Sequence, residues 1–216
     1  MQGAIIRKID MHKKYPISGI ILAGGENSRV NGLNKTFFKV GSQSIFERIY
    51  SIMNSFFDDL IVVTRTPDEF LGWDIMIVPD IYHAHCSLNG IYSGVLYATN
   101  PQSFVVACDT PFISKDLITY MCDTYSNACD VYYPQTEKGN EPLFAIYSKR
   151  CLNCFKNHLQ LGKYKISKCI KSLKTDTIHE STLRKKDPNL LSFYNVNTAA
   201  DLAEANRKLK ERINET

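Results

Sequence analysis

The chain has no long hydrophobic run. None of its apolar stretches approaches the ~20 residues that a helix needs to cross a bilayer, so we predict no membrane-spanning segment. Residues 1–16 contain four basic residues interrupted by Asp10, without an apolar run and a small-residue cleavage site. This pattern does not match a secretory signal. We interpret residues 1–16 as an N-terminal extension and residues 17–216 as a single domain.

Paired cysteines and a concentrated basic surface are also missing. The seven cysteines are odd in number and irregular in spacing, which is typical of reduced thiols in a cytoplasmic protein and not of a disulfide scaffold. A net charge of +4 at pH 7 suits a small anionic substrate, but it is too low for a nucleic-acid-binding surface. We therefore predict a cytoplasmic protein that binds neither nucleic acid nor membranes.

Short apolar runs alternate with segments of helical periodicity. This alternation predicts an α/β fold with a mostly parallel sheet. A capping box of Ser44 and Glu47 marks the start of one helix. The other expected helices cover residues 88–98, 114–125, 151–159 and 198–214. The expected strands cover residues 17–22, 37–40, 60–64, 75–78, 104–107, 130–133, 143–147 and 193–196.

A glycine-containing loop follows the first expected strand and runs from Leu22 to Lys35. Glycines such as Gly24 and Gly25 allow backbone N–H groups to approach a polyphosphate closely. Arg29 and Lys35 supply positive charge for its oxygens. The loop has neither the contiguous Gly-Lys-Ser/Thr of a Walker loop nor the G-x-G-x-x-G dinucleotide pattern. The alternative is a surface turn with two solvated basic residues.

Two carboxylates follow other expected strands. Asp109 comes after the apolar run 104–107, and Asp80 comes after 75–78. Both therefore belong at the carboxyl edge of the sheet, where open α/β folds bind ligands. Mg²⁺ takes one or two carboxylates together with substrate phosphates, so we predict Asp109 as a Mg²⁺ ligand. Each carboxylate has an alternative role as a helix cap or turn former.

The loop resembles the signature of the MobA-type molybdenum cofactor guanylyltransferases, LAGGxxxRMGGxDK, with identical spacing over fourteen positions. Three further segments resemble motifs of that family in the same order, so that the resemblance spans about residues 17–205. The segments are Cys108-Asp109-Thr110-Pro111-Phe112, Glu141-Pro142-Leu143-Phe144-Ala145-Ile146-Tyr147 and Phe193-Tyr194-Asn195-Val196-Asn197-Thr198.

The resemblance implies a Rossmann-like three-layer αβα nucleotidyltransferase fold. It also implies transfer of GMP from GTP to molybdopterin, with Mg²⁺ as cofactor and with transient contact to other cofactor biosynthesis proteins as one possibility. The nucleotide-binding half would cover about residues 17–125 and the acceptor-binding half about 126–216. The resemblance implies that GTP is bound by Leu22, Ala23, Gly24, Gly25, Lys35, Asp80 and Asp109. It assigns Mg²⁺ to Asp109 and the pterin to Asn195 and Asn197, and the expected catalytic residues are Arg29, Lys35 and Asp109.

The chain departs from the family pattern in the loop, where Val30, Asn31 and Asn34 replace the Met, Gly and Asp of the signature. It also departs at the segment that usually reads GPLAG, which here is residues 86–90 with only Leu88 and Gly90 retained. Asn89 within it has two alternatives, a hydrogen bond to a base edge or a helix cap. The whole function has alternatives too. They are a related nucleotidyltransferase that uses CTP or a sugar-1-phosphate acceptor, and a non-catalytic nucleotide-binding regulator.

Two groups of potential metal or redox ligands stand outside these motifs. His83, His85 and Cys86 crowd after Asp80 and are weighed as a zinc site, but no second ligand pair follows at a recognisable spacing. Cys151 and Cys154 have the spacing of a redox pair. Their helical context favours a structural role instead.

Overall fold

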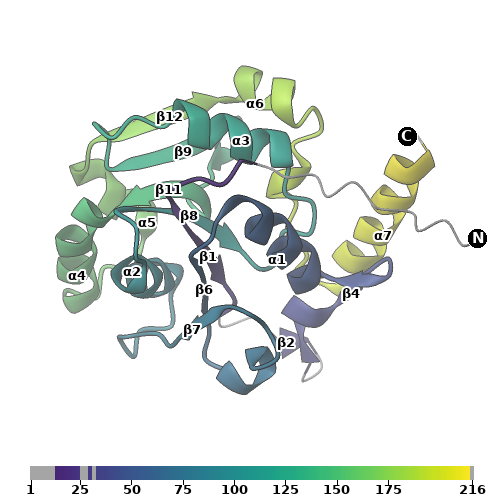
Figure 1. Cartoon of the computed structure of the whole chain (residues 1–216), viewed down its shortest axis with the longest axis horizontal. Helices are drawn as coiled ribbons and strands as arrows, with labels where there is room; N and C mark the ends of the chain where they lie inside the picture. Colours follow the sequence, from purple (N-terminus) through teal and green to yellow (C-terminus); the bar gives the residue numbers. More distant parts are fainter. Residues whose placement is uncertain (1–12, 25–28, 31–32, 215–216) are drawn as a thin grey trace, which may run out of the picture.

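The computed structural model describes residues 13–24, 29–30 and 33–214. Its main sheet has eight strands, with β10, β9, β11, β8, β1, β6 and β7 in order and β12 beside β9 (Figure 1). The strands of this sheet are β1 (Ser18–Leu22), β6 (Leu60–Val63), β7 (Met76–Val78), β8 (Gln102–Ala107), β9 (Val131–Thr136), β10 (Gly139–Asn140), β11 (Phe144–Ser148) and β12 (Thr175–His179). Two small hairpins are β2 (Arg29–Val30) with β3 (Leu33–Asn34), and β4 (Lys39–Val40) with β5 (Gln43–Ser44).

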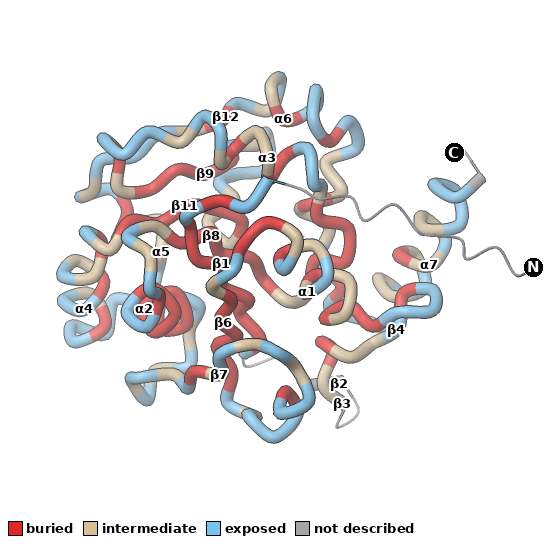
Figure 2. The backbone as a smooth tube through the Cα atoms, in the orientation of Figure 1, coloured by how far each residue is buried: buried red, intermediate tan, exposed pale blue. Residues whose placement is uncertain are grey.

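Helices cover both faces of the sheet and make three layers (Figure 1). The α-helices are α1 (Ile45–Phe56), α2 (Ser87–Tyr97), α3 (Lys115–Thr124), α4 (Leu152–Gln160), α5 (Ile166–Cys169), α6 (Glu180–Lys186) and α7 (Ala199–Asn214). Residues of β1 alternate between two cores, because successive side chains of a strand point to opposite faces. Ile21 packs with Ile49 and Met53 of α1, whereas Ile20 packs with Ile91 of α2. Figure 2 shows the buried residues concentrated in the sheet and on the helix faces that cover it.

The mostly parallel sheet predicted from the sequence is confirmed. Strands β8, β1, β6 and β7 are parallel, and β12 is parallel to β9. Strand β11 is antiparallel to both β8 and β9 and so reverses the chain direction between them. No helix in the described part of the chain is long and apolar enough to cross a membrane.

Most local predictions are confirmed, and the capping signals account for them. The Ser44 hydroxyl accepts a hydrogen bond from the Glu47 amide, and the Glu47 carboxylate accepts one from the Ser44 amide, at the start of α1. Ser114 caps α3 by accepting from the Leu117 amide. At α7 the Thr198 hydroxyl accepts from the Asp201 amide 3.1 Å away.

Two predicted strands are wrong. Residues 35–37 form a 3-10 helix, η1 (Lys35–Phe37), and only Lys39–Val40 of the expected strand 37–40 is extended in β4. The Asn34 side chain favours this helix because it accepts a hydrogen bond from the Thr36 amide. The expected strand 193–196 is likewise replaced by the 3-10 helix η5 (Leu191–Phe193) and an irregular segment.

Helix α2 lies so close to β1 that Gly94 has no room for a side chain. A Cβ there would stand 2.6 Å from Ile20 Cγ2 and 3.2 Å from Val63 Cγ2, and both neighbours are β-branched and stiff. We expect Gly94→Val to destabilise the fold by about 1–3 kcal/mol, which lowers Tm by several degrees in a chain of this length. Thermal unfolding followed by circular dichroism measures the change. Gly72→Val is the matched control, because a Cβ at Gly72 meets nothing within 4 Å, and equal Tm values for the two variants would contradict the close approach.

Candidate nucleotide site

The carboxyl ends of four parallel strands meet at one edge of the sheet, and the candidate site is built there. Backbone bonds hold the ends together: the Ala23 amide donates to the Val63 carbonyl (2.8 Å), and the Cys108 amide donates to the Leu22 carbonyl (3.0 Å). The Thr64 amide donates to the Val78 carbonyl (3.0 Å). Because the strands are parallel, the residues that follow each of them lie at the same edge.

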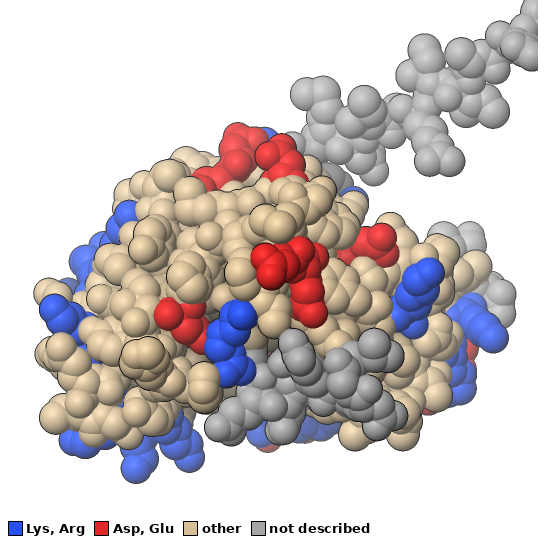
Figure 3. Space-filling model, turned by 90° about the horizontal axis from the view of Figure 1, so that it is seen from below, with Lys and Arg blue, Asp and Glu red and all other residues tan. Residues whose placement is uncertain are grey.

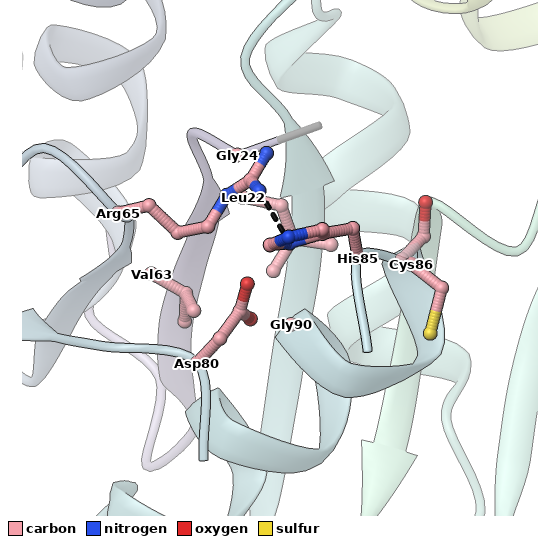
Figure 4. Close-up of a pocket in the computed structure, with 9 residues that line it drawn as sticks. Leu22, Gly24, Val63, Arg65, Asp80, His85, Cys86 and Gly90 are labelled. Carbon is pink, nitrogen blue, oxygen red and sulfur yellow. Dashed lines mark hydrogen bonds between the residues drawn. The ribbon is translucent and has the colours of Figure 1, made fainter. Parts of the chain in front are cut away.

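A small pocket at this edge, called here the Asp80 pocket, has a volume of about 20 Å³. Its lining residues are Leu22, Gly24, Val63, Arg65, Asp80, His85, Cys86, Ser87 and Gly90. Figure 4 shows the Asp80 carboxylate pointing into the pocket and the Arg65 side chain reaching across it to the ring of His85, with which it forms a hydrogen bond. The guanidinium of Arg65 can only donate, so Nδ1 of His85 accepts this hydrogen bond.

The charge state of Asp80 depends on this arrangement. Partial burial raises the pKa of the Asp80 carboxyl, and the positive charges of Arg65 and His85 act in the opposite direction. Gly90, on α2, brings the helix backbone close to the same carboxylate, since a Cβ there would be 3.9 Å from Asp80 Oδ1. The Asp80 carboxylate is thus positioned between α2 and the side chains of Arg65 and His85.

Asp109 lies at the end of β8, beside the start of η1. The Cys108 sulfur is 3.1 Å from the Thr36 hydroxyl, and this contact ties the two segments together. Lys35 is buried, with 7% of its surface exposed. Burial raises the pKa of the Asp109 carboxyl, whereas the positive charge of Lys35 lowers it. The predicted catalytic pair is therefore brought together.

One carboxylate oxygen of Asp109 accepts no hydrogen bond from the described residues. Oδ1 is buried and has no hydrogen-bond partner among the residues that the structure describes. A buried carboxylate oxygen without a partner is energetically unfavourable. A hard divalent cation binds such an oxygen, so Asp109 fits the metal that we predict for it.

A second and larger pocket lies near Asp109. The Val196 amide donates to the Asp109 carbonyl (2.8 Å), which places Asn195 and Asn197 on either side of this contact. Asn195 lines the pocket, called here the Asn195 pocket, which has a volume of about 490 Å³. Its other lining residues are Thr136, Glu137, Lys138, Glu141, Glu180, Arg184, Asn189, Leu190, Leu191, Phe193, Tyr194, Glu204 and Lys208. Asn197 does not line it; its amide instead donates to Asp201.

Comparison with known proteins decides the family. The sequence model of the MobA-like NTP transferase domain matches residues 19–177, most of the chain. The chain belongs to the MobA-like NTP transferase family. The nucleotidyltransferase fold and the family resemblance predicted from the sequence are thereby confirmed.

Full-length relatives of this MobA-like transferase support the assignment. A molybdenum cofactor guanylyltransferase of Desulfosudis oleivorans is 37% identical over 194 residues, which cover 90% of this chain and 96% of that protein. A probable molybdenum cofactor guanylyltransferase of Clostridium perfringens (strain SM101 / Type A) is 30% identical, with 88% and 96% covered. The crystal structure of molybdopterin-guanine dinucleotide biosynthesis protein A from Archaeoglobus fulgidus has the same fold, with a TM-score of 0.79 at 24% identity over 90% of this chain and 100% of that one.

Some predicted positions of the MobA-like transferase lie outside the described residues. Gly25 is one of them. Arg29 is described only through its backbone, which pairs with Asn34 in the β2–β3 hairpin. Leu22 and Gly24 line the Asp80 pocket, and Ala23 is buried beside them.

Asn89 takes neither of the two roles considered for it. Its side chain is buried and accepts from the Tyr82 amide (3.2 Å), and it donates to the carbonyls of Tyr82 (2.6 Å) and Ala84 (2.9 Å). It therefore braces the loop that follows Asp80. The cluster His83, His85 and Cys86 does not form a metal-compatible group within the described residues.

Sequence reasoning missed Arg65 and His85 as pocket residues. Arg65 is two residues beyond the end of β6, just as Asp80 is two residues beyond the end of β7. The position of a charged residue after a buried parallel strand was the available signal. His85 was noticed only as a possible metal ligand, because nothing local in the sequence indicates its contact with Arg65.

Proposed function

We propose that this chain is a molybdenum cofactor guanylyltransferase, which transfers GMP from GTP to Mo-molybdopterin and releases pyrophosphate in the cytoplasm. The observation that carries the proposal is the unpartnered Oδ1 of Asp109 beside buried Lys35, in a chain whose full-length relatives bear that name. A carboxylate and an ammonium at a sheet edge suit a polyphosphate and its counter-ion.

In the proposed reaction a phosphate oxygen of the pterin substrate attacks the α-phosphorus of GTP. A new P–O bond forms there while the bond from the α-phosphorus to the bridging oxygen breaks, and pyrophosphate leaves with that electron pair. The chain's task is then to position two anions and to neutralise charge. Lys35 and the amides of the Leu22–Gly25 loop would hold the leaving group, and Arg29 would assist. Asp109 would hold Mg²⁺, which, when bound, neutralises charge on the phosphate oxygens.

In the proposal each substrate has its own place. Asp80 and its neighbours in the small Asp80 pocket, within about residues 17–125, would contact an edge of the guanine base, and the Asn195 pocket, within about 126–216, would take the pterin. Asn195 lines the larger pocket, and Asn197 would contact the acceptor from its exposed position. The hydrogen bond from the Val196 amide connects Asp109 to the segment that contains Asn195 and Asn197. The reacting phosphates of the two substrates would meet at Asp109.

The direct test is pyrophosphate release from GTP in the presence of Mg²⁺ and Mo-molybdopterin. We expect release with GTP and formation of molybdopterin guanine dinucleotide. Release with CTP in place of GTP, or with a sugar 1-phosphate in place of the pterin, would identify a different transferase on the same fold. Binding of GTP without release under any of these conditions would identify a nucleotide-binding regulator.

Asp80 gives a prediction about base choice. An ionised carboxylate only accepts hydrogen bonds, and guanine offers N1–H and N2–H donors that cytosine lacks in the same positions. We expect Asp80→Asn to lower kcat/KM for GTP roughly 10–100-fold, because the variant loses hydrogen bonds to a charged group. Steady-state rates with GTP and with CTP measure it.

Asp74→Asn is the matched control for this experiment, because Asp74 is exposed just before β7 and away from the pocket. It should keep the rate with GTP. An Asp80→Asn variant with unchanged kcat/KM for GTP would show that this carboxylate does not form hydrogen bonds with the base.

A further inference from the structure

A cluster of sulfur and imidazole groups lies away from the sheet edge, where α4 packs against α5. Cys154 and His158 are four residues apart on α4, a spacing that puts both on one face of the helix. Cys169 ends α5 and is fully buried, whereas the other two are half-buried. The ligand atoms of the three residues lie within 4.8 Å of one another.

We propose that Cys154, His158 and Cys169 bind a soft divalent cation of the Zn²⁺ class. A tetrahedral zinc ion with Zn–S bonds of ~2.3 Å separates two sulfur ligands by about 3.8 Å, and a sulfur and a nitrogen ligand by about 3.6 Å. The Cys154 and Cys169 sulfurs are 3.3 Å apart, and the Cys154 sulfur is 3.7 Å from Nδ1 of His158. Shifts of a few tenths of an ångström therefore suffice.

The donor set selects the kind of ion. Two thiolates and an imidazole suit Zn²⁺, whereas Mg²⁺ and Ca²⁺ require oxygen ligands such as carboxylates, and none belongs to the cluster. Before an ion binds, Nδ1 of His158 can donate to the Cys154 carbonyl 3.1 Å away. Binding would exchange this hydrogen bond for a metal bond.

The cluster has a route to solvent and a fourth ligand within reach. His158 also lines a surface hollow together with Gly162, Lys163, Tyr164, Lys165 and Lys168, and the end of the molecule that carries α4 is rich in basic side chains (left in Figures 1 and 3). The exposed Ser172 hydroxyl is 3.3 Å from the Cys154 sulfur. Solvent or this hydroxyl would complete four-fold coordination.

An ion at this position would stabilise the fold. Cys169 belongs to the core that also contains Leu88 and Ile91 of α2, and α4 packs against α2. An ion at 100 times its Kd adds about 2.7 kcal/mol to stability. For a chain of this length that corresponds to a rise in Tm of roughly 5–10 °C.

The test uses the full chain, reduced and freed of metal with a chelator. On addition of Co²⁺ we expect one equivalent to bind with thiolate-to-cobalt charge-transfer absorption, and Zn²⁺ to displace it and raise Tm. Cys154→Ser and Cys169→Ser should each weaken binding at least ~10²-fold. Cys122→Ser, on α3 and outside the cluster, is the matched control and should bind normally.

A second measurement needs no variant. Zn²⁺ should protect Cys154 of the reduced chain from alkylation, as mapped by mass spectrometry, while Cys86 and Cys122 remain as reactive as before. A reduced chain that takes up no metal, with or without a Cys154–Cys169 disulfide after exposure to air, overturns the proposal. So does Co²⁺ binding that is unchanged in both serine variants.

Discussion

Asp109→Asn is expected to lower kcat by about 10²–10³-fold, the loss typical of removing one group that stabilises transition-state charge. The carboxylate lies at the end of β8, and its buried Oδ1 makes no hydrogen bond within the described structure. No group in the described part of the chain uses this oxygen, so it is available to a ligand. Pyrophosphate release at saturating GTP and Mg²⁺ measures the effect.

The stability of the same variant separates a site defect from a folding defect. Burial raises the pKa of Asp109, so the folded state holds the proton more tightly than the unfolded state. The stability that this group contributes is present at low pH and is lost as pH rises through the folded-state pKa. Near neutral pH the ionised carboxylate is therefore unfavourable, and Asp109→Asn should match or exceed the parent Tm.

Asp123→Asn is the control for Asp109. The Asp123 carboxylate is bound by Lys13 and by the Tyr15 hydroxyl, each at 3.0 Å, far from the sheet edge. It should keep full kcat. If Asp109→Asn keeps kcat within a few-fold of the parent, Asp109 has no part in the reaction.

The core of the fold and the placement of the site could be predicted because both depend on local pattern. The apolar runs 17–22 and 104–107 form neighbouring parallel strands, so Gly24 and Asp109 necessarily reach one edge. The Ser44–Glu47 capping box is likewise a local signal. Where the hydrophobic pattern and the capping residues predict the same element, the long-range contacts of the folded chain leave that element in place.

The remaining elements depend on long-range contacts. Strand β12 (Thr175–His179) is polar, and only Ile178 in it is buried, so no apolar pattern marks it. It exists because it pairs with β9, more than forty residues earlier. The segment after Phe193 looks like a strand because of its apolar residues. Its Val196 amide instead donates to the Asp109 carbonyl, and the neighbouring Asn195 lines the Asn195 pocket.

Lys35→Met is expected to lower kcat/KM for GTP by about 10²–10³-fold, comparable with the loss of a charge-stabilising group at an active site. A buried ammonium is energetically unfavourable unless it meets negative charge, and Asp109 supplies part of that charge. Asp201 also interacts with the charge of Lys35, and the triphosphate would add further negative charge. Steady-state kinetics with GTP measures the change, and Lys39→Met, which removes an exposed lysine at β4, should leave the rate unchanged.

Lys35→Met also predicts a direction for the pH profile, which a general loss of binding would not. The positive charge of Lys35 lowers the pKa of Asp109, so its removal raises that pKa and reduces the ionised fraction at a given acidic pH. The acid limb of kcat/KM against pH should therefore move to higher pH in the variant. An acid limb that stays in place while kcat/KM falls would show that Lys35 contacts the nucleotide without controlling the charge of Asp109. If neither kcat/KM nor the acid limb changes, Lys35 belongs to the fold alone.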